Sequence, residues 1–182
     1  FYYTNGSVDT FNKQYNDYPE EYKRRFKKDD GDGRLYRDDR GSGIKQYLDE
    51  LKGIAVGDVW SDIMSFQQAA TSSEIVGYPT QKPELLIERI IKASSNAGDL
   101  VFDCFMGSGT TQAVALKLGR RFIGADINLG AVQTTTTRLL KIVAETAAPT
   151  LLDSDKTTYT GFEVFNVNNY EIFRNPLEAR SI

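Results

Sequence analysis

The stretch of sequence that most constrains the fold spans residues 100–111 and reads Leu-Val-Phe-Asp-Cys-Phe-Met-Gly-Ser-Gly-Thr-Thr. An apolar run ends there in an acidic residue, enters a glycine turn and continues into residues typical of a helix. Gly107 and Gly109 lack the Cβ atoms that would block a sharp turn and a close approach of the backbone to a ligand. The pattern predicts a buried parallel strand containing Val101 and Phe102, followed by a turn that seats a nucleotide-like ligand.

The residues after the glycine turn predict that this strand belongs to a βαβ unit. A helix is expected over residues 110–118, and a second strand over residues 121–126. The carboxylate of Asp126 at the end of the second strand falls where a βαβ unit places an acid against the hydroxyls of a ribose. Asp103, Asp126 and the glycine turn are therefore expected to define one pocket.

Three classes of ligand use a turn of this kind, and the residues separate them unequally. A P-loop requires a lysine directly before the helix Ser/Thr, and Gly109 holds that place, which disfavours a nucleoside triphosphate. A dinucleotide fingerprint has a third glycine where this chain has Gln112. This weakens the interpretation as a dehydrogenase but leaves it open. Asp103 is unfavourable beside a pyrophosphate and suits an ammonium or sulfonium centre, which favours S-adenosylmethionine.

Three segments together resemble the motifs of the DNA methyltransferases that methylate amino groups. Residues 103–111 resemble motif I, the cofactor loop, and residues 124–127 resemble motif II. Residues 77–84, Gly-Tyr-Pro-Thr-Gln-Lys-Pro-Glu, resemble motif X, which precedes a helix that closes over the methionine end of the cofactor. The order X, I, II is similar to that of a permuted class with its catalytic half first, such as type III modification subunits. The resemblance implies an α/β, Rossmann-like fold of S-adenosylmethionine-dependent methyltransferases.

The resemblance also assigns cofactor-binding residues, position by position. Asp126 matches the acid that holds the ribose hydroxyls, and Thr80 and Lys82 match the motif X cap. The chain departs from the family at Cys104, where proline is usual, and at Met106, where a smaller residue is common and which is expected to reshape the methionine pocket. The loop positions assigned to cofactor binding are Asp103, Cys104, Phe105, Gly107, Ser108, Gly109 and Thr110.

The catalytic tetrad of this family, Asp/Asn/Ser-Pro-Pro-Tyr/Phe, is absent, because no two prolines are adjacent in the sequence. Its chemistry needs a polar side chain and a backbone carbonyl that hold the target amine, with an aromatic ring stacked on the flipped base. The resemblance therefore implies the C-terminal part of a methyltransferase, with an incomplete fold, no catalytic residue of its own and no activity alone. The intact enzyme would methylate the exocyclic amine of adenine, or less commonly cytosine-N4, in a specific duplex DNA site of a restriction-modification system.

Composition limits the remaining classes of function. At 182 residues and 40% hydrophobic content, the chain suits one domain or a domain and a half. The single cysteine excludes an internal disulfide, and without histidine the usual metal-site spacings cannot form, so no metal is predicted. No apolar run approaches membrane-spanning length, which predicts a cytoplasmic protein, prokaryotic by its resemblance, with no membrane partner. The net charge of −3 requires any DNA contact to come from a local patch.

Such a patch lies in residues 16–28, which begin with a helix-start signal. Five cations lie on the expected helix, and Tyr15, Tyr18 and Tyr22 lie alongside. One interpretation is a helix that contacts DNA phosphates, and the other is a solvated charged helix. The cations assigned to DNA binding are Lys23, Arg24, Arg25, Lys27 and Lys28. The resemblance places residues 1–57 in the target-recognition region and residues 58–182 in the cofactor-binding part of the methyltransferase domain.

Further elements complete the expectation. Helices are predicted over residues 44–52, 84–93 and 130–144, the last ended by Pro149, with a strand within residues 159–173 and a helix from residue 174. Trp60 fits a core anchor better than a wall of the cofactor cleft. Two rivals stay open, a dinucleotide-binding oxidoreductase and a non-catalytic DNA-binding remnant. A homodimer and a restriction subunit are further partners that the resemblance allows.

Overall fold

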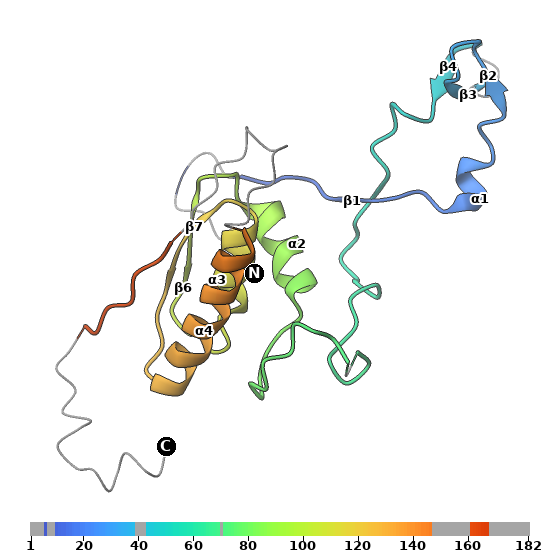
Figure 1. Ribbon diagram of the computed structural model, residues 1–182. Helices are drawn as coiled ribbons and strands as arrows, with labels where there is room; N and C mark the ends of the chain where they lie inside the picture. The colour runs from blue at the N-terminus through green and yellow to red at the C-terminus, as the bar shows by residue number, and fades with distance from the viewer. Residues whose placement is uncertain (1–5, 7–9, 39–42, 70, 147–160, 168–182) are drawn as a thin grey trace, which may run out of the picture. The chain divides into compact units, whose positions relative to one another are not determined.

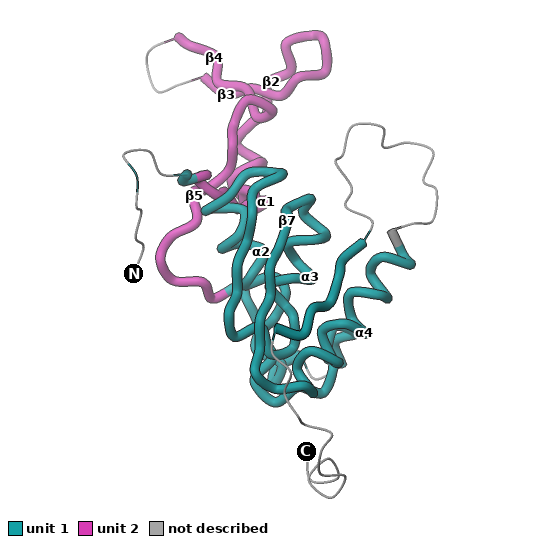
Figure 2. The backbone as a smooth tube through the Cα atoms, turned by 90° about the vertical axis from the view of Figure 1, so that its left-hand side faces the viewer, with its two compact units in different colours: residues 1–11, 62–182 teal, residues 12–61 magenta. Residues whose placement is uncertain are grey.

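A computed structural model of the protein describes residues 6, 10–38, 43–69, 71–146 and 161–167, which form two compact units (Figure 2). The smaller unit spans Asn12–Ser61, and the larger one contains the chain from Asp62 onward together with the residues before 12. The predicted boundary after residue 57 falls just before the boundary between these units. Each unit has its own hydrogen-bonded strands.

The larger unit is an α/β arrangement built on two parallel strands (Figure 1). Its elements are α2 (Glu84–Ser94), β6 (Leu100–Asp103), α3 (Thr110–Lys117), β7 (Arg121–Gly124) and α4 (Leu129–Thr146). β6 and β7 pair from Leu100 opposite Arg121 to Asp103 opposite Gly124, and α3 connects them. This βαβ unit confirms the predicted parallel pair and its α/β class. The helices predicted over residues 84–93, 110–118 and 130–144 are confirmed within two residues at each end.

Helix α3 lies at the centre of the larger unit. Most of its residues are buried, and the buried set includes the polar Thr110 and Gln112 as well as the apolar run Ala113–Leu116. Ala113 and Leu116 pack against Leu139 and Ile142 of α4, and the opposite side of α3 packs against Ile91 of α2. The helix is therefore held between α2 and α4. This also fixes the end of the glycine loop, which leads directly into the first turn of α3.

The described residues cover only one face of the two-stranded sheet. Val101 and Phe122 point toward the helices and are partly buried, whereas Phe102 and Ile123 on the other face are 62% and 51% exposed. The prediction of a strand buried around both Val101 and Phe102 is thus right for Val101 and wrong for Phe102. A parallel strand is buried on both faces only where both faces are covered, and no described segment covers the second.

Gln112 occupies the position where a dinucleotide fingerprint has its third glycine. The residue is 1% exposed, and its side chain lies against Gly124 of β7, where an added Cβ would come within 2.7 Å of Gln112 Nε2 and 2.8 Å of Met106 Sδ. The glycine that allows helix and strand to approach therefore lies on the strand. Both side-chain amide atoms of Gln112 lack a hydrogen-bond partner among the described residues.

Apolar and polar side chains alternate in residues 162–167, which predicts a strand. The structure contradicts this prediction for the residues that it describes. Residues 161–167 form no regular element. Phe162 packs against the cluster of α3 and α4, while Phe165 and Val167 are exposed. Alternation specifies only which side chains face a core; a strand also needs regular pairing within a sheet, and residues 161–167 belong to none of the described sheets.

The smaller unit consists of short strands and one helical turn. Its elements are β1 (Tyr15–Asn16), α1 (Glu20–Lys23), β2 (Lys28–Asp29), β3 (Leu35–Asp38), β4 (Lys45–Tyr47) and β5 (Ile54–Ala55). β1 pairs with β5, and β2, β3 and β4 form an antiparallel sheet in that order. The turn between β2 and β3 is closed by Asp29, whose Oδ1 accepts the backbone N–H of Gly31 at 2.8 Å and of Gly33 at 3.1 Å.

The basic helix predicted for residues 16–28 is wrong except for the single turn Glu20–Lys23. α1 ends at Lys23, the chain turns at Arg24 and Arg25, and Lys28 already belongs to β2. Phe26 is 3% exposed and lies under the Arg37 guanidinium, 5.0 Å from its carbon to the ring centroid. Closely spaced cations repel one another on a helix, and burying Phe26 favours the turn instead.

The helix predicted over residues 44–52 is also wrong, because part of this segment forms β4. Tyr47 pairs with Tyr36 of β3, with ring centroids 5.7 Å apart, and Arg37 Nε donates a hydrogen bond to Gln46 Oε1 at 2.8 Å. The helical spacing of apolar residues competes here with cross-strand pairs, and the pairs prevail. Trp60, expected in a core, is only partly buried.

Two predicted features, the helix end at Pro149 and the helix from residue 174, lie outside the described residues. In the part that the structure describes, none of the helices combines the length and apolar character needed to span a membrane.

Gly109 is the glycine of the cofactor-loop segment whose replacement we expect to be costly. Its φ is +69°, and an added Cβ would lie 2.5 Å from Cγ2 and Oγ1 of Thr135 on α4. Gly109→Ala should lower the free energy of unfolding by about 3 kcal/mol, the upper end for a strained residue, because a clash adds to the strain. Gly77→Ala is the matched control, since its φ is +76° and no atom lies within 4 Å. It should cost about 1 kcal/mol, and equal losses in denaturant unfolding would contradict this account.

Candidate functional site

The candidate site lies at the carboxyl ends of β6 and β7. Because β6 and β7 are parallel, both strands end at the same edge of the sheet. The loops that follow them are hydrogen-bonded to each other there. Ala125 N donates to Asp103 O at 2.9 Å, and Met106 N donates to Ala125 O at 3.1 Å. Ligands of open α/β sheets bind at this edge, so the predicted motifs I and II meet where a ligand is expected.

Asp126 links the glycine turn to the start of α4. Its Oδ2 accepts the backbone N–H of Gly107 at 2.9 Å, and its Oδ1 accepts that of Asn128 at 2.9 Å. The Asn128 side chain in turn caps α4 by accepting the N–H of Gly130 at 2.7 Å. Each carboxylate oxygen of Asp126 thus makes one protein hydrogen bond and retains a further lone pair.

Asp103 is held by the first residues of its own loop and of α3. Its Oδ1 accepts the backbone N–H of Phe105 at 3.0 Å, and its Oδ2 accepts the hydroxyl of Thr111 at 2.6 Å. Neither Asp103 nor Asp126 forms an ion pair with any lysine or arginine that the structure describes. The site therefore presents two carboxylates without compensating positive charge.

A cleft of about 1160 Å³ opens beside this edge, and Asp126, Phe105 and Cys104 line it. Phe105 is 87% exposed and Cys104 is a free, exposed thiol. Asp103 lines a different cavity of about 320 Å³ next to α2. The expectation that both acids line one pocket is thus not met in the described residues: they share the sheet edge and lie on separate cavities.

The polar residues of the glycine loop point inward. Ser108 and Thr110 are each 4% exposed, and their hydroxyl oxygens lie 3.0 Å apart. Thr135 Oγ1 of α4 donates to Gly107 O at 3.2 Å. Any contact that Ser108 makes with a ligand would therefore come from its backbone, because its side chain faces the protein.

The predicted motif X segment lies against the glycine loop. The ring of Tyr78 comes within 3.2 Å of the position of a Cβ at Gly107, and the Thr110 hydroxyl donates to Lys82 O at 3.3 Å. The Lys82 and Thr80 side chains are exposed, and Lys82 Nζ donates to Thr80 O at 3.2 Å. The structure thus brings motif X and motif I together, mainly through the backbone and Tyr78.

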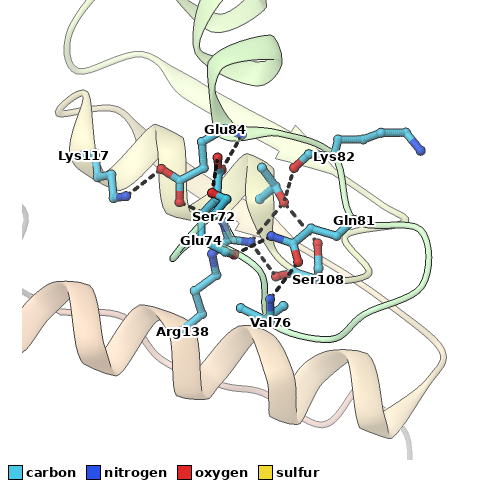
Figure 3. A network of polar contacts seen from close by, with 10 residues as sticks. Ser72, Glu74, Val76, Gln81, Lys82, Glu84, Ser108, Lys117 and Arg138 are labelled. Atoms are coloured by element: carbon cyan, nitrogen blue, oxygen red, sulfur yellow. Dashed lines mark hydrogen bonds and ion pairs between the residues drawn. The ribbon is translucent and has the colours of Figure 1, made fainter. Parts of the chain in front are cut away.

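A polar network joins α2, α3, α4 and the glycine loop (Figure 3). Glu84 at the start of α2 accepts Arg138 Nη2 at 2.7 Å and Lys117 Nζ at 2.6 Å. Burial alone would raise the pKa of Glu84, but the hydrogen bonds from Lys117 and Arg138 outweigh burial and hold that pKa below its ordinary value. Glu84 is therefore a charged carboxylate that ties three helices together.

The start of α2 is capped from a distance by the segment that precedes motif X. Glu74 Oε2 accepts the backbone N–H of Glu84 at 2.8 Å, and Gln81 Nε2 donates to Glu74 O at 2.6 Å. The Gln81 amide also accepts the N–H of Val76 at 2.9 Å. Pro83 itself supplies no side-chain cap, so motif X is held in place by the same residues that begin α2.

Two of the five cations assigned to DNA contact are neutralised within the smaller unit. Lys23 Nζ lies 2.7 Å from Asp17 Oδ2 and 3.0 Å from Glu20 Oε1, and Lys28 pairs with Asp38. Their charge is offset by these acids, which weakens the attraction of Lys23 and Lys28 for phosphate.

The other three cations, Arg24, Arg25 and Lys27, are more available for contact with phosphate. The Arg25 guanidinium carbon lies 5.3 Å from the centroid of the Tyr22 ring, which itself stacks on Tyr18 at 4.3 Å. Arg24 and Lys27 are exposed, and neither has an ion-pair partner among the described residues. The predicted patch therefore reduces to Arg24, Arg25 and Lys27.

Sequence reasoning missed several residues of this site. Asn128 carried a detectable signal, because an asparagine directly before a helix is a typical N-cap. Thr111 could have been found as the helix residue that faces the strand-end acid. Thr135 and Arg138 lie inside α4, where no local pattern marks a polar residue as a contact of a distant loop.

Comparison with known proteins places the chain in a family. Residues 1–137 match the family model described as DNA methylase, and the chain belongs to that family. It is 49% identical over 86 residues to the type II methyltransferase M1.MboII of Moraxella bovis, covering 46% of this chain and 33% of that protein. It is 62% identical over 55 residues to DNA adenine methyltransferase YhdJ of Escherichia coli (strain K12), covering 30% of this chain and 19% of that protein.

Among solved structures, the chain is similar to the crystal structure of the M1.HpyAVI-SAM complex. The identity is 43%, the TM-score is 0.36, and the match covers 37% of this chain and 33% of that chain. The chain spans a third or less of the length of the relatives named here. In the part that the structure describes, no three His, Cys, Asp or Glu residues are arranged to hold a metal ion.

Acid should weaken the network around Glu84. Because the fold lowers the pKa of Glu84, its contribution to stability is complete above the ordinary value of 4.5 and is lost as pH falls through the lowered value. Glu84→Gln should lower the free energy of unfolding at neutral pH by about 3 kcal/mol, since it leaves the buried Arg138 unpaired. Its stability should also fall less steeply with acid than that of the unaltered protein.

Chemical unfolding between about pH 3 and about pH 7, a range that includes the ordinary titration of carboxyl groups, measures both effects. The exposed Glu145→Gln is the control and should follow the unaltered protein. Parallel curves for Glu84→Gln and the unaltered protein would show that Glu84 is not held charged by the fold.

Proposed function

We propose that this chain is the cofactor-binding segment of a site-specific DNA methyltransferase, and that its cofactor is S-adenosylmethionine. The observation that carries the proposal is the meeting of Asp103, the glycine loop and Asp126 at the carboxyl edge of a parallel strand pair in a member of the DNA methylase family. M1.HpyAVI, to which the chain is 43% identical over the matched part, was crystallised as a complex with SAM.

Asp126 fits the ribose of such a cofactor. Its carboxylate faces the cleft and is fixed by the N–H groups of Gly107 and Asn128, while each oxygen keeps a lone pair. Ribose hydroxyls donate hydrogen bonds, so an acid held in this way would bind them without reorganising. Phe105, exposed at the same cleft, offers an apolar surface to the ligand.

Asp103 fits the positively charged part of the cofactor. The carboxylate has no cationic partner among the described residues, so a ligand bearing an ammonium or sulfonium group would supply the missing charge. A dinucleotide would bring a pyrophosphate to the same edge, where the two carboxylates repel it. The charges at the site therefore favour S-adenosylmethionine over the oxidoreductase alternative.

When bound, the cofactor supplies an activated methyl group. The residues that would position that group are Asp126 and Asp103, which share the sheet edge although they line separate cavities. The motif X segment around Tyr78 and Lys82 lies against the loop between them. The target that we propose is the exocyclic amine of adenine in duplex DNA, with cytosine-N4 as the alternative. One of the relatives is named a DNA adenine methyltransferase, which supports the first.

We also propose that the catalytic residues lie outside this chain. No Pro-Pro pair occurs in the sequence, so the motif that would hold the target amine is missing. The order of motifs X, I and II supports a permuted enzyme whose catalytic half precedes this segment, although the relative M1.MboII is named a type II enzyme and not a type III subunit. On this proposal the segment alone transfers no methyl group.

Titration calorimetry of the full-length protein with S-adenosylhomocysteine tests the cofactor. Asp126→Ala should raise Kd at least about tenfold, or about 1.4 kcal/mol, because the ribose acceptor and the anchor of the glycine turn are lost together. Asp99→Ala is the control, since Asp99 is an exposed acid before β6, at the opposite end of the strand. Binding of NAD instead, or no binding by the folded protein, would contradict the proposal.

The smaller unit is proposed to contact the DNA duplex through Arg24, Arg25 and Lys27, with Lys23 and Lys28 contributing less. The support is their exposure without neutralising acids, in contrast to the ion pairs of the other two. A net charge of −3 for the chain means that phosphate attraction must come from such a local group.

Salt-dependent DNA binding tests this contact. The double variant Arg24→Ala with Lys27→Ala should flatten the slope of log K against log salt by about 2, because each lost phosphate contact removes about 0.9. The control is Lys141→Ala, an exposed cation on α4, which should leave the slope unchanged. An unchanged slope in the double variant would mean that these residues form only a solvated surface.

A further inference from the structure

The glycine loop is attached to α4 through two consecutive carbonyl groups. Thr135 Oγ1 donates to Gly107 O at 3.2 Å, and Arg138 Nη1 donates to Ser108 O at 3.2 Å. The two donors are three residues apart on α4 and so lie on the same face of that helix. Both carbonyls therefore point toward α4.

Arg138 joins the loop to three other parts of the larger unit (Figure 3). Its Nη1 also donates to Thr110 Oγ1 at 3.0 Å, and its Nη2 donates to Glu84 Oε1 at 2.7 Å. Thr110 gives its single proton to Lys82 O, so it can only accept from Arg138 and from Ser108. One guanidinium thus fixes the loop, the first residue of α3, the first residue of α2 and, through Thr110, motif X.

The side chain of Arg138 is built into the interior and is not a surface cation. It is 6% exposed, and its charge is compensated by Glu84, whose side chain is 20% exposed. The planar fork of arginine makes these contacts in directions that the single ammonium group of lysine cannot reproduce. A buried arginine directed at a ligand loop is costly unless its contacts are met, and here the described residues meet them.

We propose that Arg138 is a positioning residue for the cofactor loop: it holds the peptide groups of the glycine turn in the orientation that binds the cofactor. The proposal rests on the proposed function. Gly107 and Gly109 have φ of +50° and +69°, and glycine also reaches other conformations at little cost. In a planar peptide, a C=O fixed toward α4 turns the following N–H the other way. Thr135 therefore sets the N–H of Ser108, and Arg138 sets the N–H of Gly109, which donates to Met106 O at 2.8 Å and closes the turn.

Loss of the hydrogen bonds from Arg138 should weaken cofactor binding, because fewer molecules would have the glycine loop in its binding conformation. The apparent Kd of a ligand that binds only one loop conformation is the intrinsic Kd divided by the fraction of molecules that remain in that conformation. Lys117 provides the matched comparison. It pairs with the other oxygen of Glu84 at 2.6 Å, but it makes no hydrogen bond or ion pair with the loop among the described residues, so it shares only the structural part of the network.

The test compares Arg138→Lys and Lys117→Gln in the full-length protein, by calorimetric titration with S-adenosylhomocysteine and by hydrogen exchange of residues 107–110 without ligand. Arg138→Lys keeps a cation for Glu84, and we expect it to raise Kd about tenfold and to speed exchange in the loop. Lys117→Gln should leave both unchanged. Thermal unfolding confirms that each variant is folded.

A Kd for Arg138→Lys equal to that of the unaltered protein would overturn the proposal, and so would equal weakening in both variants, which would reveal a general loss of stability. Failure of the unaltered protein to bind S-adenosylhomocysteine would instead refute the proposed function. In that case the exchange experiment still decides whether Arg138 holds the loop, because it needs no ligand.

Discussion

The candidate site depends on the close approach of the glycine turn to α4. Gly109 has no room for a Cβ, because Thr135 would lie 2.5 Å from it. This approach lets Thr135 and Arg138 reach the loop carbonyls, and it brings the start of α4 to Asp126, whose carboxylate holds Gly107. Because Gly109 has no side chain, the glycine loop can pack directly against α4 while it connects the end of β6 to the start of α3.

The charges of the larger unit are arranged in two distinct ways. Glu84 and Arg138 form a buried pair that is satisfied by hydrogen bonds on both sides, and they hold helices together. Asp103 and Asp126 have hydrogen-bonded carboxylates without a described cation beside them. Buried charge that is compensated serves structure, whereas carboxylates without a counter-charge keep lone pairs and negative charge available to a ligand.

The exposed face of the sheet agrees with the limited coverage of the relatives. Phe102 and Ile123 lie on the face of β6 and β7 that no described segment covers. In α/β proteins both faces of a parallel sheet are normally covered, and this chain spans a third or less of the relatives compared. Within the described residues, the sheet of the larger unit has two strands and one covered face.

The sequence by itself determined the strand, glycine turn, helix and second strand around Asp103 and Asp126, because their spacing and the backbone freedom of glycine are local properties. It also determined the family, through three short motifs in order. It could not determine that residues 44–52 would contain a strand, since helical spacing and cross-strand pairing compete and only the partner β3 decides between them. Only the tertiary structure could place Arg138 at the loop, because a hydrogen bond across 30 positions of sequence leaves no local pattern.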